Sequence, residues 1–355
     1  RRPGSVCRYS RCCCRDRIQR HVHDHSDAPG RSGSRRSFES FPIRPARFVN
    51  VDVRIDQAWQ HGMVPFLYQN LNSICPNEVP VEEMGRLKNL FLQNHQRNIL
   101  LSGELVKLTN IFKSAGITSI AYKGPTVAAL IYGNLALRRF SDLDILVRKR
   151  DFAQARELLV KETYEPELNI AAARHHDFLK VNYVQQFTRR DGRAVVELHW
   201  DVAPRNFAFD FDIDSLWQRA IEIELLGHKL LMPCAEDLLL LLCVHGTKDL
   251  WERFEWICGV SELIRVTPLL DWQRVLAEAH ETSSTRMLLL GLALAHDILS
   301  ADIPEEILKK IQADDEVLRL VQVVKERVFA DDKSYSLSFK VPFHLKARER
   351  LRDRI

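Results

Sequence analysis

Two aspartates, Asp142 and Asp144, alternate with Leu143 and Ile145 in a segment whose pattern predicts a β-strand. Because successive side chains of a strand point to opposite faces, the two carboxylates share one face, about 7 Å apart. Paired carboxylates on a rigid strand can hold a divalent metal ion against a phosphate chain. The pair therefore points to metal-dependent phosphate chemistry, although chance alone often produces so short a pattern.

A Lys-Gly pair, Lys123-Gly124, stands one predicted helix upstream of these acids. It follows a β-branched run at 116–122 that predicts a strand, and it precedes a helix predicted over 125–132. A turn into a helix N-terminus binds phosphate well, because free N–H groups and the helix dipole point at the ligand and glycine permits close approach. Strand, Lys-Gly turn, helix and D-x-D strand in this order form a much stronger signal than D-x-D alone.

A third carboxylate, Glu197, lies on a strand predicted over 194–200, where polar and apolar side chains alternate. The alternation puts Glu197 and His199 on one face and Leu198 and Trp200 on the other. If this strand neighbours the one that carries the aspartates, Glu197 can face them. The sequence thus offers three carboxylates for one site.

These motifs together resemble the DNA-polymerase-β-like nucleotidyltransferase superfamily. More narrowly, they resemble a bacterial nucleotidyltransferase family that has a Lys-Gly turn where better-known relatives have Gly-Ser, and several abortive-infection toxin nucleotidyltransferases share a similar pattern. The resemblance spans about residues 50 to 330, and the family pattern usually has aspartate where this chain has Gly259. The residues that carry it are Lys123, Gly124, Tyr132, Gly133, Arg139, Ser141, Asp142, Asp144 and the segments 195–200 and 245–256.

The resemblance implies Mg²⁺-dependent transfer of an NMP from an NTP to a hydroxyl-bearing acceptor, with release of pyrophosphate. The acceptor would be a small molecule, a protein or an RNA. The implied catalytic residues and ligands of two Mg²⁺ ions are Asp142, Asp144 and Glu197. The implied nucleotide contacts are Lys123, Gly124, Arg139, Ser141 and Lys248, with Arg139 as a planar fork and Lys123 as a point charge on the triphosphate.

Helices are predicted over 236–246 and 250–266, and His245, Lys248, Trp251 and Glu255, spaced by three or four residues, are expected on one helical side. The resemblance suggests that this helical segment packs over the nucleotide site. A plain structural helix with buried tryptophans is the alternative.

The bulk composition sets limits on partners and location. Residues 1–47 carry twelve arginines and four acidic residues, a net of +8, so the whole-chain charge of +4 leaves −4 for the rest. This acidic balance gives no electrostatic argument for a nucleic-acid partner. The longest apolar runs are far shorter than the roughly 20 residues of a membrane span. Scattered cysteines indicate a reducing compartment, so we expect a cytoplasmic protein without membrane association.

The predicted fold class is α+β, with a small mixed β-sheet nucleotidyltransferase core between a helical N-terminal segment and a helical C-terminal domain. Strands are expected at 116–122, 142–147, 178–187 and 194–200, and only helices beyond 214. Residues 1–46 are expected to be a disordered extension, or upstream sequence translated from a misplaced start. A targeting peptide and a metal-binding segment are less favoured. The predicted divisions are 1–46, the helical segment 47–113, the core 114–214, the helical domain 215–335 and a basic tail 336–355.

Two other functions compete with an enzyme. One is a non-catalytic nucleotide-binding regulatory module with the same fold. The other is a helical interaction protein in which D-x-D is incidental, and it predicts that Asp142, Asp144 and Glu197 lie more than about 10 Å from a common point, whereas a two-metal site spans only about 4 Å.

Overall fold

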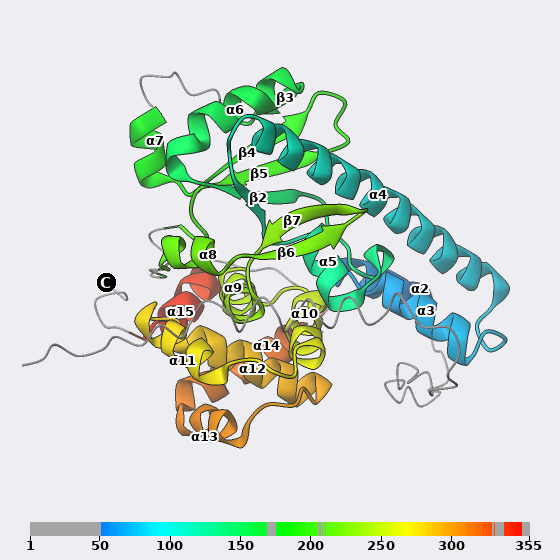
Figure 1. Ribbon diagram of the computed structural model, residues 1–355. Coiled ribbons are helices and arrows are strands. Elements are labelled where there is room, and N and C mark those ends of the chain that lie inside the picture. Colours follow the sequence, from blue (N-terminus) through cyan, green and yellow to red (C-terminus); the bar gives the residue numbers. More distant parts are fainter. Residues whose placement is uncertain are drawn as a thin grey trace, which may run out of the picture. The chain divides into compact units, whose positions relative to one another are not determined.

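The computed structural model describes residues 51–168, 175–204, 211–328 and 337–349, together with Phe207, Phe209 and Ala330. The chain divides into two compact units, and all of these residues belong to the second, Asn50–Ile355. This unit combines a seven-stranded mixed sheet with many helices, which confirms the predicted α+β class (Figure 1). The extension predicted over 1–46 lies outside the described residues.

The sheet brings the two acid-bearing strands together at its centre. The strands are β1 Ser119–Ala121, β2 Leu143–Val147, β3 Tyr164–Pro166, β4 Val184–Arg189, β5 Val195–His199, β6 Ile221–Leu225 and β7 His228–Met232. Their order across the sheet is β3-β4-β5-β2-β1-β7-β6. β2 runs parallel to β5 and antiparallel to β1, while β7 runs parallel to β1. Side chains on β2 and β5 can therefore meet directly.

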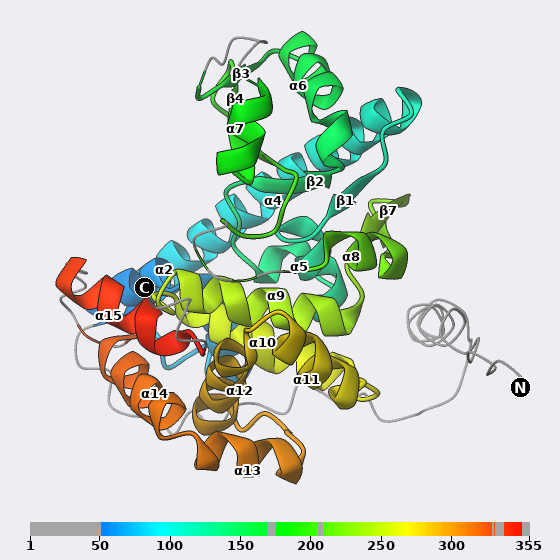
Figure 2. The same cartoon turned by 90° about the vertical axis from the view of Figure 1, so that its left-hand side faces the viewer.

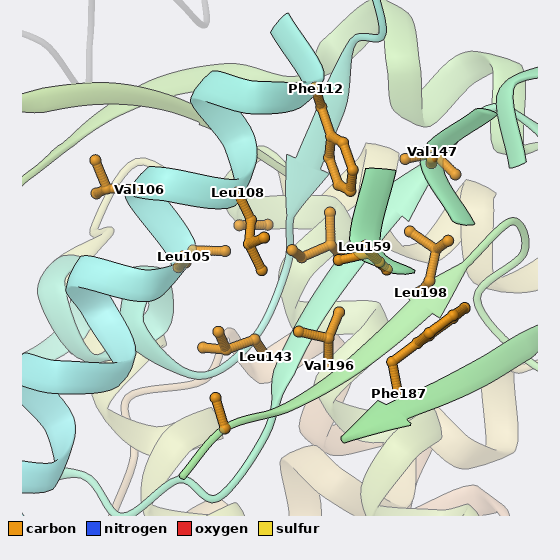
Figure 3. Packing of buried hydrophobic residues seen from close by; sticks show 14 of the residues in the cluster. Leu105, Val106, Leu108, Phe112, Leu143, Val147, Leu159, Phe187, Val196 and Leu198 are labelled. Carbon is orange, nitrogen blue, oxygen red and sulfur yellow. The ribbon is translucent and has the colours of Figure 1, made fainter. Parts of the chain in front are cut away.

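Two helices, α4 (Val81–Ser114) and α6 (Phe152–Lys161), cover the apolar face of the sheet. Leu143, Ile145 and Val147 of β2 are fully buried there. Figure 3 shows this core, in which Val196 and Leu198 of β5 lie with Leu105, Leu108 and Phe112 of α4 and Leu159 of α6. Each such side chain stabilises the fold by about 1.5–3 kcal/mol. The alternation predicted for β2 and β5 is confirmed, because the carboxylates are left for the opposite face.

The other helices flank this core on both sides in sequence. Before it, α2 (Val51–Gln60) and α3 (Val64–Ile74) contact each other and α4. After it come α8 Ile213–Arg219, α9 Ala235–Lys248, α10 Phe254–Val266, α11 Trp272–Glu281, α12 Thr285–Leu299, α13 Glu305–Ala313, α14 Asp315–Val328 and α15 Leu337–Ala347. α9 packs against α10, α11, α12 and α15 (Figure 2). The leucine-rich stretch of α9 is buried on every side, and none of the described helices is long and apolar enough to cross a membrane.

Two sequence predictions about this region are wrong. The strand expected over 178–187 begins only at Val184, because α7 (His175–Val181) holds its first part and lets Phe178 pack beside Trp200. The region beyond 214 was expected to be helical, yet β6 and β7 form a hairpin there. Leu226 and Gly227 make its turn, with φ of 52° and 76°.

Candidate active site

Asp144 and Glu197 occupy paired positions on the adjacent parallel strands β2 and β5. Asp142 lies one residue before β2. All three carboxylates line one cavity of about 280 Å³. The structure thus brings the three predicted acids together. The interaction-protein alternative predicts the opposite, that they lie far apart.

The electrostatics of the two aspartates differ sharply. Burial alone would raise the pKa of Asp144, but Lys123 and His199 outweigh it and hold this pKa well below its usual value. The atoms responsible are Lys123 Nζ, 3.0 Å from Asp144 Oδ1, and His199 Nε2, 3.3 Å from the same oxygen. For Asp142, burial and the charges of Asp144 and Glu197 raise the pKa to about 6. Asp142, Asp144 and Glu197 therefore repel one another, and their hard oxygen donors suit a divalent cation such as Mg²⁺.

The Lys123-Gly124 turn lies directly beside these acids. It leads into α5 (Pro125–Tyr132), whose N-cap is Gly124 with φ 57° and ψ −120°, a conformation that favours glycine. A Cβ on Gly124 would lie 3.4 Å from the backbone oxygen of Asp142. Thr126 Oγ1 fixes the turn by donating to the carbonyls of Ala121 and Lys123, at 3.1 Å each. The predicted Lys-Gly turn and the helix that follows it are therefore both present, next to the carboxylates.

Two neighbouring arginines line the cavity in different ways. Arg139, the predicted phosphate contact, stacks its guanidinium 4.1 Å from the Trp59 ring centre and donates to the Trp59 carbonyl at 3.0 Å. Arg138 was not singled out from sequence, yet its Nη1 lies 3.4 Å from the carbonyl oxygen of Gly124. No ion pair within 4.0 Å involves Arg138 in the described part of the chain. Ser141 follows these arginines in the segment before β2; it is exposed and lines the same cavity.

The segment 245–256 contains the predicted break between two helices, although the first helix ends two residues later and the second begins four residues later than predicted. α9 ends at Lys248 and α10 begins at Phe254, because Leu250 and Trp251 take left-handed φ values of 59° and 54°. Trp251 is completely buried and does not line the cavity, whereas His245, Lys248 and Glu255 do. The prediction that these four residues share one helical side is therefore wrong.

The cavity nevertheless receives side chains from both of these helices. His245 and Lys248 come from the end of α9, and Lys248 Nζ lies 3.2 Å from Asp249. Glu255, at the start of α10, is buried, and Arg253 Nη1 donates to its Oε1 at 3.1 Å. Side chains from both helices thus line the cavity together with side chains from the sheet.

Sequence reasoning also missed His199 and Tyr122 as members of the site. Donor atoms of His199, Asp144 and Glu197 all lie within 4.8 Å of one another, a grouping that could hold a metal ion. Tyr122 Oη lies 3.0 Å from the other ring nitrogen of His199. The signal was present for His199, since it shares a strand face with Glu197. No sequence pattern predicts the contact between Tyr122 and His199.

Opposite charges balance across the cavity. Its lining includes five basic side chains, Lys123, Arg138, Arg139, Lys248 and Arg253, and five carboxylates, Asp142, Asp144, Glu197, Asp249 and Glu255. A triphosphate that entered alone would leave the site strongly negative. One that entered with divalent cations would keep it near neutrality. The donor set therefore fits a metal–nucleotide complex better than a free nucleotide.

Comparison with known proteins gives a family match and likenesses to solved structures. A family described as "Uncharacterised nucleotidyltransferase" matches residues 49–300. No curated protein matches the chain. Among solved structures, a crystal structure of an antigenic nucleotidyltransferase-like protein from Paracoccidioides brasiliensis is 14% identical, covering 62% of this chain and 92% of that chain with a TM-score of 0.33.

Proposed function

Because the chain belongs to a family of uncharacterised nucleotidyltransferases, we propose that it transfers an NMP from an NTP to a hydroxyl-bearing acceptor, with Mg²⁺, and releases pyrophosphate. The narrower kinship with the bacterial Lys-Gly family is part of the proposal, since Lys123-Gly124 forms the turn before α5. We expect the acceptor to be a small molecule, a protein or an RNA end.

One observation carries the proposal. Asp144 and Glu197 are register partners on adjacent strands, and the N-terminus of α5 lies against Asp142 in the same cavity. Carboxylates that hold divalent cations and a helix N-terminus that binds phosphate are the two parts that nucleotidyl transfer needs. The balanced charge of the cavity supports a metal–nucleotide complex as the ligand.

The residues take distinct parts in the proposed reaction. Asp142, Asp144 and Glu197 would hold Mg²⁺, which when bound neutralises phosphate charge and polarises the phosphorus–oxygen bonds. Lys123, Arg138, Arg139, Ser141, Lys248 and the Gly124 N-terminus would bind and orient the triphosphate. The acceptor oxygen bonds to the α-phosphorus, the bond to the pyrophosphate oxygen breaks, and Glu197 takes the acceptor's proton. Positioning and charge stabilisation supply most of the acceleration.

The test offers each of ATP, GTP, CTP and UTP, labelled on the α-phosphate, to the protein with cell extract and Mg²⁺. Label should pass into one class of molecule with the wild-type protein and not with an Asp142→Asn/Asp144→Asn double variant. Equal labelling by the double variant would overturn the proposal. Mg²⁺-dependent NTP binding without any transfer of label or release of pyrophosphate would instead identify a regulatory nucleotide-binding module.

A further inference from the structure

Two buried side chains, Tyr122 and His199, form a hydrogen-bonded chain that reaches the proposed metal ligands Asp144 and Glu197. Tyr122 and His199 are each 1% exposed. Tyr122 Oη lies 3.0 Å from His199 Nδ1. His199 Nε2 lies 3.1 Å from Glu197 Oε2 and 3.3 Å from Asp144 Oδ1. The imidazole therefore contacts carboxylates from two strands with one nitrogen and a phenol with the other.

From this geometry we propose that Tyr122 and His199 are positioning residues that keep the His199 proton on Nε2, so that the ring donates to Glu197 and Asp144 and is not itself a metal ligand. The inference rests on the proposed function, because it assigns those carboxylates to the metal. The inference goes beyond the proposed function because it assigns a role to the buried His199.

The proton position follows from the partners of each nitrogen. A neutral imidazole has one donor and one acceptor nitrogen, and ionised carboxylates only accept. A bare lone pair on Nε2 would face two carboxylate oxygens, so the proton belongs on Nε2. Nδ1 is then the acceptor, and the Tyr122 hydroxyl donates to it.

This arrangement decides which carboxylate oxygens are left for a cation. Lys123 and His199 both contact Oδ1 of Asp144, so Oδ2 makes neither contact. On Glu197 the contact from His199 goes to Oε2, which leaves Oε1. The hydrogen bonds orient both carboxylates at once, and hydrogen-bond partners of this kind typically contribute 10–100-fold to metal affinity.

The test is nitrogen-15 NMR of histidine-labelled, metal-free protein at neutral pH, with the His199 signals assigned by their loss in His199→Gln. We expect a protonated Nε2 in the wild-type protein, and Nε2 should still be protonated after Mg²⁺ is added. Tyr122→Phe should shift the Nδ1 signal and weaken binding of Mn²⁺, measured without nucleotide, about 10-fold.

Tyr164→Phe is the matched control. Tyr164 is also 1% exposed and donates its hydroxyl to a carboxylate, Glu104 Oε1, at 3.0 Å, but outside the cavity. It should leave the His199 signals and Mn²⁺ affinity unchanged. A bare Nε2 in the metal-free protein, or loss of the Nε2 proton on adding Mg²⁺, would overturn the proposal. The wild-type spectrum decides this even if a variant folds poorly, and whether or not nucleotide transfer is found.

Discussion

Asp144 and Glu197 stand opposite each other on the adjacent parallel strands β2 and β5. This pairing does not depend on a flexible loop, because Leu143 and Ile145 on one strand and Val196 and Leu198 on the other are fully buried around the two acids. The carboxylates are therefore held in place by the core beneath them.

Removing one charge of this pair should abolish the metal-dependent part of nucleotide binding. We expect Asp144→Asn and Glu197→Gln each to lower turnover by roughly 100-fold or more. Thermal shift with NTP should no longer respond to Mg²⁺ in either variant. Asp177→Asn is the control, since Asp177 is 79% exposed on α7. If Asp144→Asn kept its full Mg²⁺ response, the acids would not be the metal site.

Lys123 should matter for stability as well as for binding. It pairs with the buried Asp144 at 3.0 Å, and Lys123→Met would leave that carboxylate without its main cation. Breaking a buried pair costs about 3–5 kcal/mol, whereas an exposed pair contributes about 0–1 kcal/mol. Lys107→Met, which breaks the half-exposed pair with Glu162, gives the comparison. Chemical denaturation measures both, and equal losses would contradict the prediction. Mg²⁺ should restore part of the stability of Lys123→Met only.

The conformation of Gly124 should be needed for nucleotide binding. Gly124→Ala would strain a backbone with φ 57° and ψ −120° and bring a methyl close to the Asp142 carbonyl. We expect a loss of about 1–3 kcal/mol in unfolding free energy and weaker NTP binding. Gly133→Ala, at the other end of α5, has φ 58° with nothing within 4 Å of a new Cβ. It should lose stability but keep NTP affinity, measured by titration calorimetry.

His245 predicts how stability changes with pH. Burial, followed by the charges of Lys123 and Lys248, lowers the pKa of His245 well below its usual value, although Asp249 lies 3.1 Å away. Unfolded histidine binds a proton near pH 6.5, and folded His245 does so only at lower pH. The unfolded state therefore gains protons first, and stability falls as the pH drops from about 6.5 towards the folded pKa.

The difference between wild type and His245→Gln isolates this effect from the other histidines. The variant should lose less unfolding free energy than the wild type between about pH 7.5 and pH 5.5. His228→Gln, at an exposed position on β7, should keep the wild-type slope. Parallel pH profiles for wild type and His245→Gln would show that the buried imidazole does not control this slope.

Local sequence patterns predicted the elements that carry the candidate site better than the elements around them. α5 was predicted with its observed bounds, and β2 and β5 within one residue at each end, because period-two alternation and a Pro-led helix are local signals. The hairpin of β6 and β7 was missed, although Ile221-Glu-Ile-Glu-Leu225 alternates and Gly227 follows. Its pairing to β1 is a long-range contact that local patterns do not contain.

The site residues divide in the same way. Asp142, Asp144 and Glu197 stood out because a charged residue interrupts an apolar strand pattern. Arg138 could not be separated from Arg139 by sequence, since which arginine turns towards Gly124 depends on the loop and on Trp59. The break between α9 and α10 was predicted, but its position depends on Leu250 and Trp251, two non-glycine residues with positive φ.

Trp251 connects the cavity wall to a helix that does not touch the cavity. Its ring fills the space that a side chain at Gly246 or Gly291 would need, since a Cβ there would come within 2.6 Å and 3.1 Å of the ring. At Gly291, in the middle of α12, a Cβ would come even closer to the Cys243 sulfur of α9, at 2.5 Å. Both neighbours, Cys243 and Trp251, belong to the α9–α10 segment that also carries His245, Lys248 and Arg253 of the cavity lining. The close packing of this cavity wall thus requires the absence of a side chain on α12, a helix that does not line the cavity.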